Sequence, residues 1–130
     1  MASIFTKIIN GEIPGHKVAE NEEYIAILDI SPLKKGHVLV IPKKEIDYIF
    51  DLEDDVLAGL HIFAKKVAIA MKKVLPCTRI GVTVIGLEVP HTHVHLIPID
   101  GVSDMDFSKS KLKLSDEEMK ETADLIRSAL

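Results

Sequence analysis

Short runs of apolar residues, separated by turn-forming residues, divide much of the chain into segments typical of β-strands. β-Branched and aliphatic side chains fit the pleated, half-buried surface of a sheet. The run at residues 37–42 shows no polar alternation, as expected of a strand that is buried on both faces or lies at an interface. Together these runs predict five strands, at residues 16–20, 24–29, 37–42, 79–85 and 91–99.

The longest segment with a helical period lies between residues 51 and 75. Apolar residues recur there at spacings of three and four, from Val56 to Val74, which places them on one face of a helix. The acidic residues at 51–55 complement the helix dipole at its start, and Pro76 cannot continue the helix. We therefore predict a long helix that covers one side of the sheet.

Two shorter helices are predicted at the ends of the chain. Ser3 is a suitable N-cap for a helix that ends near Gly11 and carries an apolar stripe. Ser115 and Glu118 form the pattern of a capping box, which predicts a helix at about residues 115–129. The stripe of the first helix consists of Ile4, Phe5, Ile8 and Ile9, and the apolar face of the last consists of Met119, Thr122, Ala123, Ile126 and Leu130.

This order of elements predicts the α+β class. We expect a five-stranded antiparallel sheet with the long helix packed on it and a lesser helix at each end of the chain. The 130 residues are expected to form one domain, with a core at residues 1–100 and a C-terminal extension at residues 101–130. The apolar strand and the long helix carry more hydrophobic surface than a chain of this size readily hides, so we predict a homodimer.

Composition narrows the classes of function. A net charge of −4 argues against broad binding to nucleic-acid backbones, and no apolar run approaches the roughly 20 residues that span a bilayer. The N-terminus lacks the pattern of a signal peptide, and the one cysteine, Cys77, excludes an internal disulfide. We therefore expect a cytoplasmic protein with no nucleic-acid or membrane partner.

Three of the six histidines, His91, His93 and His95, alternate along the last predicted strand. Successive side chains of a strand point to opposite faces, so these three rings are expected on one face. Imidazole can donate, accept or carry charge near neutral pH. Three interpretations remain open: a solvated surface strand, a metal site built on a His-x-His pair, and a phosphate site with an imidazole nucleophile.

The motif around these histidines resembles the signature of the histidine triad (HIT) family of nucleotide hydrolases and transferases, most closely its Hint branch. That signature has a hydrophobic residue between successive histidines; Val94 fits the pattern and Thr92 departs from it. The resemblance includes the segments at residues 4–14, 29–32 and 36–44 and covers about residues 1–100. It implies a HIT-like fold and a homodimer.

The resemblance also implies roles for individual residues. His93 would attack the α-phosphorus of a nucleotide derivative and form a nucleotidyl-histidine that water then cleaves. His95 and His37 would bind phosphate oxygens, and His91 would orient its neighbours. This chemistry needs no metal or other cofactor. Asp29 would hold the ribose hydroxyls, and further contacts to a purine nucleotide are implied for Ile4, Phe5, Ile27, Ile30, Gly86, Glu88 and Val89.

The chain departs from the family pattern in the segment before the triad. Ile80 and Leu87 stand where the pattern has Asn and Gln, and Glu88 stands where a hydroxyl is common. Two hydrogen bonds to the nucleotide would be lost, each worth about 1.5–3 kcal/mol if the partner is charged. We therefore expect hydrolysis slower than in the Hint branch. Arg79 and Thr83, on the strand face opposite Ile80, are candidate compensators.

Two other functions fit the same residues. A nucleotide-binding protein that senses or sequesters its ligand would bind tightly and show little turnover. A metal-dependent enzyme would use His91 and His93 as ligands, and its turnover would stop in EDTA.

Overall fold

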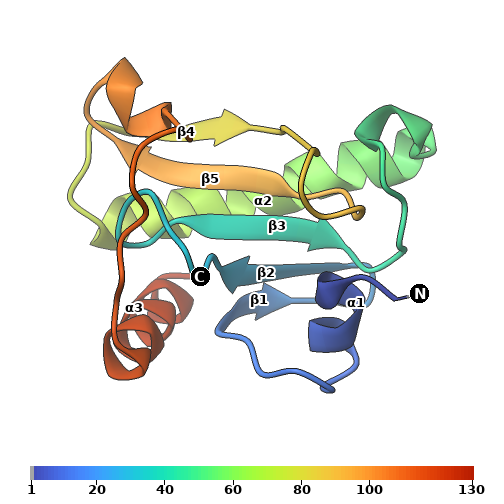
Figure 1. Ribbon diagram of the computed structural model, residues 1–130, viewed down its shortest axis with the longest axis horizontal. Helices are drawn as coiled ribbons and strands as arrows, with labels where there is room; N and C mark the ends of the chain where they lie inside the picture. Colours follow the sequence, from blue (N-terminus) through green and yellow to red (C-terminus); the bar gives the residue numbers. More distant parts are fainter. Residues whose placement is uncertain (1) are drawn as a thin grey trace.

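The computed structural model describes residues 2–130, which form one antiparallel sheet and three α-helices, with two short 3-10 helices between them. The spatial order of the strands is β1-β2-β3-β5-β4 (Figure 1). The fold is therefore α+β, as predicted. The bounds of the strands are Lys17–Glu20 for β1, Tyr24–Leu28 for β2, Val38–Pro42 for β3, Arg79–Thr83 for β4 and Val94–Ile99 for β5.

The long helix α2, Asp54–Val74, lies behind the sheet in Figure 1. The helix α1, Ile4–Ile9, is capped by Ser3, whose side chain accepts from the amide of Thr6. The helix α3, Asp116–Ser128, begins with the expected capping box and packs against α2 and β1. The short helix η1, Ile49–Asp51, precedes α2, and η2, Val102–Met105, follows β5. No helix within residues 2–130 has the length and apolar character needed to cross a bilayer.

The two central strands are buried on both faces, because each face of the sheet is covered. Alternate residues of β2 and β3 belong to a large core against α2, and the residues between them belong to a smaller cluster on the other face. The smaller cluster contains Phe5 from α1, which closes over the sheet there. It consists of Phe5, Ile25, Ile27, Leu39 and Ile41.

The prediction of a strand from residue 91 is wrong at its start, since β5 begins at Val94. The backbone amides of residues 91 and 92 donate to their own loop and to the segment after β3, rather than to a neighbouring strand. The amide of Thr92 donates to the carbonyl of Ile46 at 2.7 Å, and that of His91 donates to Val89 at 2.8 Å. His91 and His93 therefore belong to a loop that leads into β5.

Further boundaries differ from the prediction. The strands β1, β2 and β3 are each one residue shorter than predicted. The strand β4 ends at Thr83 rather than at residue 85. The predicted apolar face of the last helix is buried at Met119, Thr122, Ala123 and Ile126, but Leu130 is exposed because α3 ends at Ser128.

Candidate functional site

A cavity of about 460 Å³ opens on the sheet face opposite α2, where the loop before β5 meets the end of β2. Two of the triad histidines line it, together with Asp29 and part of the C-terminal extension. Its lining residues are Asp29, Ser31, Ile85, Gly86, Leu87, Glu88, His93, His95, Phe107 and Lys111.

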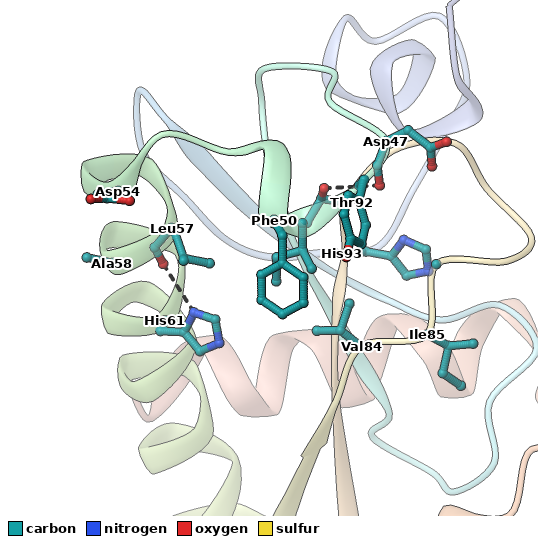
Figure 2. Close-up of a pocket in the computed structure, with 13 residues that line it drawn as sticks. Asp47, Phe50, Asp54, Leu57, Ala58, His61, Val84, Ile85, Thr92 and His93 are labelled. Atoms are coloured by element: carbon teal, nitrogen blue, oxygen red, sulfur yellow. Dashed lines mark hydrogen bonds between the residues drawn. The ribbon is translucent and has the colours of Figure 1, made fainter.

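A larger cavity, of about 730 Å³, also borders His93. Figure 2 shows that Phe50 lies there between His93 and His61 of α2. The ring of His61 bonds to the carbonyl of Leu57 in its own helix at 3.1 Å, so it does not join the triad. His93 thus stands between two cavities, and the smaller one also contains Asp29, His95 and Lys111.

The protonation of the His93 ring follows from its contacts. Its Nδ1 lies 2.7 Å from the carbonyl oxygen of His91. A carbonyl can only accept, so Nδ1 carries a hydrogen and donates it. The ring of Phe5 packs edge-on against His93 at a centroid distance of 4.9 Å. In a neutral ring these contacts leave the lone pair of Nε2 available on a ring whose orientation is fixed.

His95 is held by His37, but its Nδ1 accepts a hydrogen bond where that of His93 donates one. The amide of Leu33 donates to His37 Nδ1 at 3.1 Å, which leaves the His37 hydrogen on Nε2. His37 Nε2 then donates to His95 Nδ1 at 2.9 Å. By elimination, the neutral His95 ring carries its hydrogen on Nε2. A backbone amide therefore sets the tautomers of two rings, which no pattern in the sequence indicated.

Burial keeps these two rings neutral near pH 7. Loss of solvent contact lowers the pKa of His37 to about 3 and that of His95 to about 4, with further lowering from the neighbouring His93 in both cases. The carboxylate of Asp29 is 3.7 Å from His37 Nε2, too far for a hydrogen bond. A neutral His37 also cannot form an ion pair with it.

His91 connects helix α1 to the site. Its Nε2 donates to the carbonyl of Pro42 at 2.7 Å, and its Nδ1 lies 2.7 Å from Ser3 Oγ. Burial lowers the pKa of His91, so the neutral ring accepts the hydrogen of the Ser3 hydroxyl. Glu45 accepts from the Ser3 amide and the Thr6 hydroxyl, which lowers its pKa to about 2. This network orients the His91 carbonyl on which His93 depends.

Asp29 lies in the cavity wall and also caps the turn that follows it. Its Oδ1 accepts from the amide of Ser31 at 2.8 Å, and burial raises the pKa of its carboxyl group. Gly86 has a positive φ of 75°, a conformation that favours glycine. A Cβ on Gly86 would meet no protein atom within 4 Å. The backbone conformation, rather than crowding, thus explains glycine at this position.

The remaining candidate residues divide into three groups. Ile27 and Val89 pack with Phe5 in or against the small cluster beside the site. Glu88 lies in the cavity wall, as stated above. Ile4 and Ile30 are exposed, with accessible fractions of 44% and 72%. The structure therefore brings together most of the predicted nucleotide contacts and leaves these two side chains at the surface.

The expected effect of Ile80 on the phosphate site is wrong. Ile80 packs against the core on the α2 side of the sheet. Thr83 pairs with His95 and so shares its face of the sheet, whereas Ile80 and Val82 alternate with Thr83 and lie on the other face. An amide at position 80 would therefore point away from the cavity. Leu87 does line the cavity, so it is the one departure of the two that removes a polar group there.

Ser31 and Ile85 also line the cavity without having been predicted, and so do the two residues from the C-terminal extension, Phe107 and Lys111. The latter two follow a polar stretch without periodicity, so no pattern marked them. The ring of Phe107 packs edge-on against His95 at 4.8 Å and against His37 at 6.2 Å. The C-terminal extension is thus part of the site.

A metal ion is a poor fit to the one cluster of potential ligands found in residues 2–130. One ligand atom from each of Asp29, His37 and His95 lies within 4.8 Å of the others. However, a metal on His37 Nε2 would displace its hydrogen to Nδ1, where the Leu33 amide donates. Two donors would then face each other. His91 is no better a ligand, since both of its ring nitrogens are already bonded.

Comparisons with known proteins agree on one family. Residues 10–102 match the family model of the HIT domain. The adenosine 5'-monophosphoramidase of Saccharomyces cerevisiae is 40% identical over 98 residues, which are 75% of this chain and 62% of the yeast protein.

Two solved structures extend the likeness to nearly the whole chain. A Hit-like protein involved in cell-cycle regulation from Bartonella henselae has a TM-score of 0.86 at 33% identity, over 98% of this chain and 96% of that one. A hypothetical histidine triad nucleotide-binding protein from Sulfolobus tokodaii has a TM-score of 0.82 at 31% identity, over 96% and 89% of the two chains.

Proposed function

This chain belongs to the HIT domain family, and from that premise we propose that it acts on the α-phosphate of a nucleotide derivative. The substrate would be a purine nucleoside phosphoramidate or a dinucleotide, and the activity that of a hydrolase or nucleotidyl transferase. The observation that carries the proposal is the Nε2 of His93, which has no hydrogen-bond partner within residues 2–130 and lies on a fixed ring in a cavity shared with Asp29 and His95.

The reaction would proceed in two displacements. In the first, the lone pair of His93 Nε2 attacks the α-phosphorus; a P–N bond forms and the leaving group departs with its electron pair, taking a proton from solvent. In the second, water attacks the phosphorus, the electron pair of the P–N bond returns to Nε2, and the water proton goes to solvent. The products are the leaving group and a nucleoside monophosphate.

The other histidines would support these steps without reacting. His95 offers its Nε2–H to the phosphate oxygens, where negative charge increases in the transition state. His37 has both nitrogens bonded already, so we assign it to positioning His95 rather than to direct phosphate contact. His91 holds the carbonyl that fixes His93. Asp29 would accept from the ribose hydroxyls.

Intact mass spectrometry at neutral pH would test the chemistry. We expect a mass increase of one adenylyl group after the protein is mixed with an adenosine phosphoramidate in EDTA. The addition should be absent in His93→Ala and present in His61→Ala, a control that removes a ring bonded within α2. Addition that survives in His93→Ala would refute the nucleophile. Turnover that stops in EDTA would instead support a metal-dependent enzyme.

A nucleotide sensor is the second candidate, and Leu87 favours it, because an apolar side chain replaces an amide donor at the cavity wall. Tight binding of AMP with no adenylyl addition and no turnover would select the sensor over the hydrolase.

We also propose that the protein is a homodimer. The strand β4 is at one edge of the sheet in residues 2–130 and carries the exposed Val82. The neighbouring helix α2 exposes Ile62 and Ile69, and the segment before it exposes Phe50. A second copy paired along β4 would continue the sheet and cover this apolar surface.

A further inference from the structure

The segment between η2 and α3 covers the site and is held in place by its own contacts. In Figure 1 it passes on the side of the sheet opposite α2. Asp106 accepts from the amide and hydroxyl of Ser108, at 2.9 and 2.6 Å, which fixes the turn. The amide of Leu112 donates to the carbonyl of Pro32 at 2.8 Å, which ties the segment to the turn after Asp29. Phe107, between these anchors, contacts His95 and His37.

Lys111 is the only lysine or arginine among the residues that line the smaller cavity in the described chain. Its ammonium group donates to the carbonyls of Phe107 at 2.5 Å and Lys109 at 3.1 Å. An ammonium has three hydrogens to donate, so one remains. Within residues 2–130, neither Asp29 nor Glu88 comes within 4.0 Å of it as an ion-pair partner.

The rest of the cavity lacks a fixed positive charge. His37 and His95 are neutral near pH 7, and Ile80 points toward α2. Leu87 contributes an apolar side chain to the cavity wall. The α-phosphate of a nucleotide ester or amide carries one negative charge, and attack by a neutral imidazole adds to the charge on its oxygens. An anionic ligand therefore needs a cation that the triad does not supply.

We propose that Lys111 is this cation, and that its remaining N–H binds a non-bridging oxygen of the α-phosphate. This assignment rests on the proposed function for its substrate class. It gives the C-terminal extension a catalytic group, held in place by Phe107 and by the Leu112–Pro32 bond. The charge of Lys111 acts on the site: it opposes the burial that raises the pKa of Asp29, and it adds to the burial that lowers the pKa of His37.

Three variants separate charge from structure. Lys111→Gln loses the charge but keeps an N–H for the two carbonyls, and Lys111→Arg keeps the charge. Lys109→Gln is the matched control, because it removes a neighbouring charge whose side chain does not line the cavity. For each, we would measure kcat and KM with an adenosine phosphoramidate, the Kd for AMP at low and high salt, and the melting temperature.

We expect Lys111→Gln to weaken AMP binding or lower kcat/KM by about tenfold or more. The AMP affinity of this variant should also depend less on salt than that of the unmodified protein. Lys111→Arg should retain most of the activity, and Lys109→Gln should match the unmodified protein.

Two results would overturn the inference. One is a Lys111→Gln variant with unchanged Kd and kcat/KM. The other is an equal loss in the Arg and Gln variants together with a lower melting temperature, because Lys111 would then only close the turn. The AMP measurement keeps the two proposals apart. If the unmodified protein binds AMP but shows no turnover, the hydrolase is refuted, while the Kd values of the variants still test the role of Lys111 in binding. If the unmodified protein does not bind AMP, both proposals are refuted.

Discussion

Replacing Ser3 by alanine tests how strongly α1 is coupled to the histidine loop. The hydroxyl of Ser3 has two roles: it accepts from the amide of Thr6 as the cap of α1 at 3.0 Å, and it bonds to the buried Nδ1 of His91 at 2.7 Å. Loss of a cap costs about 1 kcal/mol. A buried ring nitrogen left without a partner costs a further 1–3 kcal/mol or so. We therefore expect Ser3→Ala to lower the free energy of unfolding by about 2–4 kcal/mol.

The chain contains a matched control for the cap alone. Ser115 caps α3 by accepting from the amide of Glu118 at 3.1 Å, and its exposed hydroxyl bonds to no histidine. Ser115→Ala should therefore cost only about 1 kcal/mol. For a chain of this length, 1 kcal/mol corresponds to a shift of roughly 4 °C in melting temperature. The expected decreases are about 8–16 °C for Ser3→Ala and about 4 °C for Ser115→Ala.

Calorimetry or circular dichroism at one fixed protein concentration would measure both shifts, since the melting temperature of a dimer depends on concentration. Urea unfolding would supply the free energies independently. Equal destabilisation by the two substitutions would refute the reasoning, because the bond from Ser3 to His91 would then contribute nothing beyond the cap.

Three other outcomes are expected. The depressed pKa values of His37, about 3, and His95, about 4, mean that the unfolded chain binds more protons below about pH 6.5. The contribution of these rings to the free energy of unfolding is then fully present above that pH, and it falls as pH decreases toward 4 by up to about 1.4 kcal/mol per pH unit for each ring. Thermal melts at several pH values would measure this decrease. A melting temperature that does not change from pH 7 to 5 would contradict the expectation. Leu87→Gln should raise kcat/KM with an adenosine phosphoramidate by about tenfold if it restores one bond to phosphate. Ile80→Asn should leave kcat/KM no higher and should lower the melting temperature, because it places an amide against the α2 core. Light scattering should give about twice the chain mass of 14.4 kDa, and Val82→Lys should reduce it to the monomer; a monomeric unmodified protein at micromolar concentration would refute the dimer.

The elements that local sequence decides could be predicted. The period of α2 follows from side chains that share one helix face, and the apolar run of β3 follows from burial on both sides of the sheet. Both depend on residues that are close in sequence. The caps at Ser3 and Ser115 were predictable for the same reason, since each bonds to an amide three residues away.

The parts that failed depend on contacts between distant segments. His91 and Thr92 have the composition of a strand, but bonds to Pro42 and Ile46 hold them in a loop. Nothing local distinguishes a strand residue from a loop residue whose partners lie over 40 positions away. The place of Lys111 in the cavity could not be predicted for the same reason, because only the folding of the extension across the sheet brings this residue to the cavity. The tautomers of His91 and His95 depend on distant donors and acceptors too.

The bonds from the Leu33 amide through His37 to His95 all run in one direction, and this has a consequence for proton movement. This series of hydrogen bonds begins at the peptide N–H of Leu33, which does not give up its proton at neutral pH. The series therefore has no proton donor at its start. His37 could pass a proton to His95 only by becoming an anion, and burial makes any charge on it unfavourable. The series of hydrogen bonds therefore orients the Nε2–H of His95 toward the cavity, and it conducts no protons. Any proton that the leaving group takes must therefore come from solvent in the cavity and not through His37.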